Sequence, residues 1–206
     1  SINPGTISQH ISTHLSGNTV FSKQSGSFIF GTSDSLEINL DCYTSIGTVT
    51  CPNVGYNSWN ISMSGMTSQG QLDFVMTDSI GNVHYQNYTV LSDLVAPTCT
   101  SNGIENGGTI YVRTLSEITV TCQDGASGVD TISIVHNSLT EQYDATHAAV
   151  KSVTFYTLID ETTLQIEAID SVGNSYSNSY QISLDDVAPE ISCRSGPDNE
   201  PIGYTH

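Results

Sequence analysis

Short runs in which every second residue is apolar recur along the chain. Clusters of Gly, Asn, Ser and Asp separate these runs, and no stretch has the spacing of an amphipathic helix. Alternation with a period of two is typical of strands that bury one face. The chain is therefore predicted to be all-β, with its short strands packed as a two-layer sandwich. The clearest runs are Leu36–Leu40, Trp59–Met63 and Leu72–Met76.

One segment of the chain occurs twice. Asp78–Pro97 recurs 92 residues later as Asp170–Pro189, and each copy begins with a D-S-x-G-N turn and ends with V-A-P. When the copies are extended back to Leu72 and Leu164, 10 of 26 positions are identical. A repeat of this length indicates a duplicated domain rather than a short solenoid unit.

The repeat divides the chain into four parts. Two modules are predicted, over residues 15–94 and 95–186, and each has a size that can fold on its own. Residues 1–14 are predicted to be a linker or the end of a preceding module. Residues 187–206 repeat the V-A-P tripeptide and a cysteine, and are predicted to be the start of a third module.

The cysteines give an alignment of the two modules. Glu117–Cys122 is matched with Glu37–Cys42. Ile132 and Ile134 are then expected on the strand equivalent to that of Trp59, whose ring we expect in the core.

This alignment leaves 12 additional residues in the second module, between its cysteine and its repeated aspartate. They are assigned to an insertion over Leu139–Thr163. Because insertions are where repeated modules acquire function, this segment is a candidate binding site.

Three motifs resemble those of a known family: A-I-D-S-V-G-N, C-Q-D-G-A-S-G-V and the D-x-V-A-P junction. Over Leu15–Asp186 and the start of a third copy, the chain resembles bacterial and archaeal immunoglobulin-like repeats of large cell-surface and secreted proteins. The resemblance implies tandem immunoglobulin-like β-sandwiches in a stalk or adhesin. Members of this family also flank carbohydrate-binding and enzymatic domains.

Basic residues are scarce. The chain has four Lys and Arg against 21 Asp and Glu, which gives a formal net charge of −17. Such a chain neutralises few phosphates, which argues against a nucleic-acid partner, and it suits anionic lipid surfaces poorly. Its apolar runs are shorter than the roughly 18 residues of a membrane-spanning helix, so membrane insertion is not expected either.

Five cysteines in a Ser- and Thr-rich β chain indicate disulfides and an extracellular or cell-surface location. Cys99 is expected to open the first strand of the second module and Cys122 to close the second strand, so these two should pair. Cys42 should then pair with Cys51 in the loop that follows it. Cys193 is left unpaired within this chain. Free buried thiols are the alternative.

Four aspartates are expected to gather where the two modules meet. In an immunoglobulin-like topology, the turn between the second and third strands and the last hairpin turn lie at the pole where the module begins. Asp124 and Asp130 lie in the first of these turns, Asp170 in the second, and Asp93 in the incoming linker. Ca²⁺ takes about six to eight oxygen ligands, so a calcium site that stiffens the joint is predicted. The alternative is that each aspartate binds the amides of its own turn.

Several other side chains are weaker candidates for binding or modification. Asn60 and Asn87 begin N-glycosylation sequons. His10 and His14 have a spacing that suits a metal only on a helix, which their neighbours disfavour. Exposed tyrosines can stack on sugar rings, and five are candidates: Tyr43, Tyr56, Tyr143, Tyr176 and Tyr180.

No catalytic motif is present: the sequence has no G-x-S-x-G elbow, no Gly-rich phosphate loop after a strand, and no histidine in a catalytic motif. An enzyme is not expected, and calcium is the one ligand ion predicted. The predicted function is a rod-like spacer or a filament or surface component with an adhesive role. Its partners would be other modules of the array, neighbouring subunits or surface glycans. The alternative is a carbohydrate- or protein-binding module with its site in Leu139–Thr163.

Overall fold

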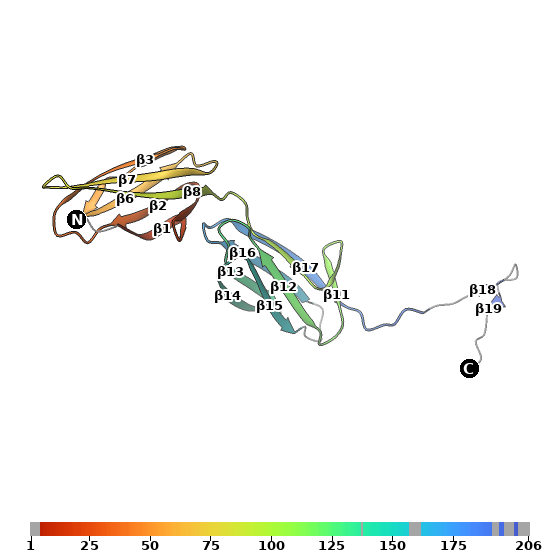
Figure 1. Cartoon of the computed structure of the whole chain (residues 1–206). Coiled ribbons are helices and arrows are strands. Elements are labelled where there is room, and N and C mark those ends of the chain that lie inside the picture. Colours follow the sequence, from red (N-terminus) through yellow and green to blue (C-terminus); the bar gives the residue numbers. More distant parts are fainter. Residues whose placement is uncertain (1–4, 137, 157–161, 191–193, 196–199, 202–206) are drawn as a thin grey trace.

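A computed structural model describes residues 5–136, 138–156, 162–190, 194–195 and 200–201. In it, two β-sandwiches follow one another along the chain and lie end to end (Figure 1). In the described part of the chain, no helix is long and apolar enough to cross a membrane. The all-β sandwich prediction is confirmed.

The first sandwich contains eight strands. They are β1 (Thr6–Ser16), β2 (Thr19–Gly31), β3 (Ile38–Thr44), β4 (Thr48–Thr50), β5 (Asn53–Gly55), β6 (Ser58–Ser64), β7 (Gly70–Asp78) and β8 (Val83–Ser92). Strand β2 belongs to both layers. Its residues 19–22 pair in parallel with β8, and its residues 25–31 pair antiparallel with β6.

The second sandwich contains the strands β9 to β17. They are β9 (Thr98–Ser101), β10 (Ile104–Asn106), β11 (Thr109–Val112), β12 (Glu117–Gln123), β13 (Val129–His136), β14 (Leu139–Ala148), β15 (Val150–Tyr156), β16 (Thr162–Asp170) and β17 (Ser175–Leu184). One layer has the order β10-β11-β17-β16-β13-β14, and the other has the order β15-β12-β9. The short strands β18 (Arg194–Ser195) and β19 (Glu200–Pro201) form a separate pair in the tail.

Each sandwich encloses its own hydrophobic core. The first core contains Phe28, Phe30, Trp59 and Phe74, with the rings of Phe30 and Phe74 4.3 Å apart. The second core is built from smaller side chains such as Ile132, and no side chain is shared between the two clusters. Two independent cores are what a duplicated domain requires.

Residues 6–14 correct the predicted boundary of the first module. They were expected in a linker or a preceding module, but β1 pairs antiparallel with β2 from Thr6 opposite Gly31 to Ser16 opposite Thr19. Thr13 is buried in this hairpin, and its hydroxyl donates to the carbonyl of Ser27 at 3.0 Å. The first sandwich therefore begins at least nine residues earlier than its cysteines suggested.

The alignment based on cysteines is also wrong. Strand β3, which carries Cys42, pairs with β7 so that Ile38 lies opposite Asp78. Strand β13 pairs with β16 in the same way, with Val129 opposite Asp170. The counterpart of β3 is therefore β13, not the β12 strand of Cys122.

Two further predictions used that alignment and are also wrong: the strand equivalent to that of Trp59, and the insertion in the second module. Trp59 is buried in the core as expected, but it lies on β6, which pairs with β2 as β15 pairs with β12. The predicted insertion also disappears, because Asp78 follows Ile38 by 40 residues and Asp170 follows Val129 by 41. Leu139–Thr163 contains β14 and β15, which are ordinary strands of the sandwich.

Candidate metal site between the two sandwiches

Three buried aspartates meet where the linker enters the second sandwich. Asp93 follows β8, Asp124 follows β12, and Asp170 is the last residue of β16. Their exposed fractions are 2%, 5% and 2%. One carboxylate oxygen of each lies within 4.8 Å of one from each of the other two. The structure thus brings together three of the four aspartates that the sequence nominated.

Asp170 holds the turn between β16 and β17. Its Oδ1 accepts hydrogen bonds from the amides of Val172 at 3.0 Å and Asn174 at 2.7 Å. Its Oδ2 accepts one from the side-chain amide of Asn174, also at 2.7 Å. The aspartate of a D-S-x-G-N turn is therefore a structural acceptor in its own right.

Asp124 and Asp93 hold their own turns in the same manner. Asp124 Oδ1 accepts from the amides of Ala126 at 3.0 Å and Gly128 at 2.8 Å. Asp93 Oδ1 accepts from the amide of Val95 at 3.2 Å, and its Oδ2 accepts from the amide of Ser127 at 3.0 Å. The alternative weighed from the sequence, in which each aspartate caps its own turn, is thus present together with the cluster.

Asn174 connects the cluster to the linker. Besides Asp170, its side-chain amide lies 3.1 Å from the carbonyl oxygen of Asp93 and 3.4 Å from that of Val95. The Asp93 amide in turn donates to the carbonyl of Ser22 in the first sandwich at 2.9 Å. The linker is therefore held from both sides.

The electrostatics of the cluster favour a bound cation. Among the described residues, no Lys, Arg or His forms a salt bridge with any of the three carboxylates. Burial raises the pKa of Asp170, the charge of Asp93 adds to the rise, and hydrogen bonds from Asn174 and Val172 oppose it. Like charges that share a buried site destabilise one another, so a cation bound among these carboxylates would stabilise them.

A buried hydroxyl lies beside the carboxylates. Ser127, whose amide binds Asp93, is 4% exposed, and its Oγ has no hydrogen-bond partner. Buried polar atoms are normally satisfied, so this hydroxyl is a candidate ligand group. Carboxylates and a hydroxyl are oxygen donors of the kind that hard divalent cations prefer. The residues present fit such an ion.

Asp130 does not belong to the cluster. It is the second residue of β13 and its side chain is 41% exposed, whereas its neighbour Val129 is buried. Asp130 lies in the register shift between Val129 and Thr131, and its side chain is outside the cluster of the other three aspartates. Its Oδ1 lies 3.3 Å from His147 Nδ1.

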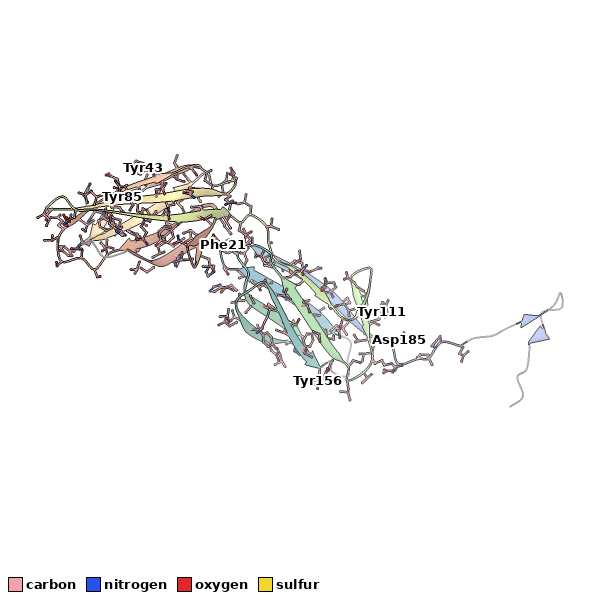
Figure 2. The ribbon with its side chains drawn as sticks, in the orientation of Figure 1. Phe21, Tyr43, Tyr85, Tyr111, Tyr156 and Asp185 are labelled. Carbon is pink, nitrogen blue, oxygen red and sulfur yellow. A yellow bond between two sulfur atoms is a disulfide. The ribbon has the colours of Figure 1, made fainter. Side chains whose placement is uncertain are left out.

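Other contacts join the two sandwiches around the linker. Lys23 Nζ donates to the carbonyl of Gly173 at 2.6 Å. The rings of His14 and His147 are 4.0 Å apart. A cleft of about 500 Å³ lies between the sandwiches, lined by His14 and Phe21 on one side and by Asp124, Ser127 and His147 on the other. Phe21 lies at the end of the first sandwich next to the second (Figure 2).

Sequence reasoning missed Ser127, Asn174 and His147 as parts of this joint. The repeated D-S-x-G-N motif contained the signal for Asn174, because its asparagine is as invariant between the copies as its aspartate. Nothing in the sequence indicated that His147 would lie against His14.

Both expected disulfides are present. Cys42 is bonded to Cys51, and Cys99 is bonded to Cys122. Cys99 and Cys122 lie opposite one another on β9 and β12, whereas Cys42 on β3 is tied to the loop after β4. Cys193 lies outside the described residues.

The remaining candidates are dispersed. Asn60 is half-buried on β6, and Asn87 is exposed on β8, so both sequons stay predictions. Among the nominated tyrosines, Tyr180 is buried, and Tyr143 and Tyr176 pack against the second core. The more exposed ones are Tyr43, at 56%, and Tyr56, at 69%.

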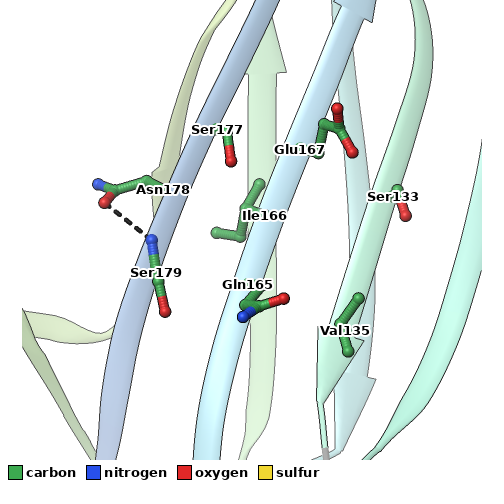
Figure 3. Close-up of a pocket in the computed structure, with 8 residues that line it drawn as sticks. All are labelled: Ser133, Val135, Gln165, Ile166, Glu167, Ser177, Asn178 and Ser179. Atoms are coloured by element: carbon green, nitrogen blue, oxygen red, sulfur yellow. Dashed lines mark hydrogen bonds between the residues drawn. The ribbon is translucent and has the colours of Figure 1, made fainter.

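A shallow groove of about 410 Å³ runs over β13, β16 and β17 (Figure 3). Its lining offers serine hydroxyls, amides and one carboxylate, that of Glu167. A hydrolase needs a nucleophile, a base and an orienting group that converge, and this lining contains no histidine or second acid to supply them.

The fold is similar to that of fibronectin(III)-like modules. Fibronectin(III)-like modules of Clostridium thermocellum CbhA superpose with a TM-score of 0.52 at 12% identity, over 88% of this chain and 94% of theirs. Tandem Ig repeats of Dlar (TM-score 0.34, 11% identity, 89% and 98% covered) and murine CEACAM1b (TM-score 0.37, 13% identity, 86% and 100% covered) are also similar. Neither a protein-family model nor a curated protein matches the sequence.

Proposed function

We propose that the chain is a structural and adhesive extracellular module: part of a rod of immunoglobulin-like repeats of the bacterial and archaeal cell-surface kind, stiffened by calcium where two repeats meet. The observation that carries this proposal is the buried cluster of Asp93, Asp124 and Asp170 at the joint. The linker supplies one of these carboxylates and the second sandwich supplies two. An ion bound there ties the linker to the second sandwich.

The joint has features that suit a spacer. The linker is held by Asn174 on one side and by Ser22 on the other. Pro97 at its end is buried and limits the backbone freedom of both itself and Ala96. A rod needs joints that resist bending, and calcium completes this one because its two positive charges offset the repulsion among the three carboxylates. Other modules of the same array are the partners that this role requires.

The location outside the cell is supported by the two disulfides. Such bonds persist in oxidising compartments and are rare in the cytosol. The scarcity of basic residues argues against a nucleic-acid partner.

Small-angle X-ray scattering of the whole chain, with EDTA or with CaCl₂, tests the calcium joint. In CaCl₂ the molecule should show a narrower range of maximum dimensions than in EDTA, because the joint bends less. Calorimetry should find one calcium ion bound per chain. Asp124→Asn should abolish both effects. Asp130→Asn is the matched control, because Asp130 lies six residues further along the same segment but outside the cluster, and it should change neither effect. Equal calcium binding by the wild type and by Asp124→Asn would remove the proposal.

A second candidate function is glycan binding on the outer face of β3, β7 and β8. Tyr43 lies opposite Asp73, and Asp73 lies opposite Asn87, while the neighbouring row contains Tyr85 opposite Val75. Tyr85 is 73% exposed and Tyr43 is 56% exposed (Figure 2), so two aromatic rings flank a carboxylate and an amide. A groove of about 580 Å³ adjoins them.

Neutral sugars fit such a face, because aromatic rings stack on pyranoses and carboxylates accept bonds from hydroxyls. This face replaces the Leu139–Thr163 segment, whose role as an insertion the structure overturns. Binding to a glycan array that Tyr85→Ala abolishes and Tyr111→Ala, on β11 of the other sandwich, preserves would support it. Absence of any Tyr85-dependent signal would leave the spacer role alone.

A further inference from the structure

Two histidines from different sandwiches lie against each other at the joint. His14 is on β1 and His147 is on β14, and their ring centroids are 4.0 Å apart with an angle of 33° between the planes. Both line the cleft between the sandwiches.

The backbone around His147 is arranged in a way that ordinary strands are not. Thr146 and His147 both have positive φ, of 55° and 58°, within a bulge of β14. Gly128 lies directly beneath, and a Cβ on it would come within 2.4 Å of the His147 carbonyl oxygen. Two consecutive non-glycine residues in the left-handed region are unfavourable, and such outliers cluster at functional sites. Here the outlier carries the imidazole across the joint.

Hydrogen bonds fix the tautomer of His147. The Ser171 hydroxyl donates its single proton to the Gly128 carbonyl at 3.0 Å, so it accepts from the Nδ1–H of His147 at 2.6 Å. Asp130 Oδ1 lies 3.3 Å from the same nitrogen. The proton is therefore on Nδ1, and the lone pair of the neutral ring is on Nε2. An imidazole whose Nδ1–H faces a carboxylate is the arrangement found for histidines that bind metals through the other nitrogen.

The surroundings of His14 disfavour a charge on its ring. Burial lowers its pKa, the neighbouring His147 and His10 lower it further, and Asp130 opposes the shift.

We propose that His14 and His147 together bind a borderline-soft divalent transition metal such as Zn²⁺ across the joint, with water completing its coordination and Asp130 as a positioning residue for His147. Zinc binds imidazole nitrogens at about 2.0–2.1 Å, so two such nitrogens lie at most about 4.2 Å apart. The ring centroids are 4.0 Å apart, so the two imidazoles must separate by about 1 Å and turn about their side-chain torsions to admit the ion between their nitrogens.

This site is chemically distinct from the aspartate cluster. The cluster offers oxygen donors, which suit calcium, whereas imidazole suits Zn²⁺, Ni²⁺ and Cu²⁺. The histidine site joins the first sandwich directly to the second, so its metal would bridge the cleft that both histidines line. The inference does not depend on the calcium proposal.

Zinc titration of the whole chain after chelator treatment, by calorimetry at pH 7.5, tests it. One zinc ion is expected to bind. His14→Ala and His147→Ala are each expected to weaken binding at least 10-fold, and Asp130→Asn should weaken it about 10- to 100-fold, as is usual for a carboxylate behind a metal-bound histidine. His84→Ala, on β8, is the matched control and should bind as the wild type does.

Two further arms make the result decisive. Asp124→Asn should retain histidine-dependent zinc binding, which separates this site from the aspartate cluster. NMR of the imidazole C–H protons should show zinc-dependent shifts of His14 and His147 and none of His84, a readout that a loss of folding cannot imitate. Zinc binding unchanged in both histidine variants, or abolished by Asp124→Asn alone, would overturn the proposal.

Discussion

The two D-S-x-G-N turns have the same hydrogen bonds but opposite electrostatics. In each, the aspartate accepts from the second and fourth residues after it and from the asparagine side chain: Asp78 from Ile80 and Asn82, Asp170 from Val172 and Asn174. Burial acts to raise the pKa of Asp78, but its hydrogen bonds outweigh burial and lower that pKa. The pKa of Asp170 is raised.

The difference originates in what surrounds each turn. The amide of Thr32 donates to the carbonyl of Asn57 at 3.0 Å, and 92 residues later the amide of Asp124 donates to the carbonyl of Ala149 at 2.9 Å. Thr32 therefore occupies the position of Asp124, and Asn57 that of Ala149. At this end of the first sandwich a neutral amide, that of Asn57, lies near the turn, whereas at the equivalent end of the second sandwich carboxylates do. We call these ends the neutral pole and the charged pole. The turn belongs to the fold, and the charge around it gives the joint its chemistry.

The largest expected effect is at the neutral pole. Asn57 is 2% exposed, and its side chain accepts from the Ile38 amide at 2.8 Å and donates to the carbonyls of Asp34 at 3.0 Å and Leu36 at 2.8 Å. Asn57→Gly keeps the positive φ of 47° accessible and removes all three bonds. The first sandwich should lose about 3 kcal/mol in its free energy of unfolding. Calorimetry should show its transition shifted and that of the second sandwich unchanged.

A control for this variant is Asn60→Ala, which changes an asparagine on the adjacent strand β6. Asn60 is half-buried and outside the core, where substitutions usually change stability by less than about 0.5 kcal/mol. Similar losses in the two variants would mean that Asn57 is not the closing group of this pole.

At the charged pole, stability should depend on calcium. At a calcium concentration about 100 times its dissociation constant, the second sandwich should gain about 2.7 kcal/mol by mass action. Asp170→Asn should remove this gain, while Asp78→Asn, the same change in the equivalent turn, should leave it intact. Chemical denaturation with and without calcium measures both. If Asp78→Asn also removes the stabilisation by calcium, the calcium effect does not come from the carboxylate cluster at the charged pole.

The two turn asparagines allow a finer comparison. Asn82 donates its side-chain amide to Asp78, whereas Asn174 donates to Asp170 and also lies near two linker carbonyls. Asn174→Ala should therefore destabilise the protein by about 1 kcal/mol more than Asn82→Ala, because the linker bonds are lost as well. Asn174→Ala should also widen the range of molecular dimensions seen in solution scattering, because the linker is held less firmly. Equal losses in both variants would mean that the linker bonds contribute nothing.

The sequence predicted the strands, the duplication and three of the four aspartates, because these depend on local patterns. Alternation identifies a strand but not its partner, since every half-buried strand has a period of two. This is why Glu37–Cys42 was matched with the wrong strand of the second sandwich, and why β1 was taken for a linker. Asp130 failed for a different reason: it lies in the strand irregularity between Val129 and Thr131, which a period of two cannot reveal.

The contact between His14 and His147 is a second feature that the sequence could not predict. His14 and His147 come from separate domains, and their meeting depends on the angle of the joint and on a bulge with two left-handed residues. Neither leaves a trace in hydrophobic periodicity. Long-range contacts between independently folded units need coordinates.

The smallest effect, and the one that compares the turns most directly, is their dependence on pH in metal-free protein. The lowered pKa of Asp78 means that the unfolded state binds more protons, so this group stabilises the first sandwich above its unfolded pKa near 3.9 and loses that contribution as the pH falls through the lower folded value. The raised pKa of Asp170 has the opposite sign. Its contribution favours folding at acid pH and is lost as the pH rises from about 3.9 through the higher folded value.

Thermal unfolding between about pH 3 and pH 7 in EDTA should therefore show the two transitions moving in opposite directions where these groups dominate. Asp78→Asn should reduce the fall in the unfolding temperature of the first sandwich at acid pH. Asp170→Asn should reduce the rise in the unfolding temperature of the second sandwich as the pH is lowered. Calcium should abolish the second slope, because a bound cation replaces the proton that the cluster otherwise takes up. If both transitions fall together with acid in the absence of metal, Asp170 is not held at raised pKa by its neighbours, and the carboxylate cluster has no unmet charge for an ion to neutralise.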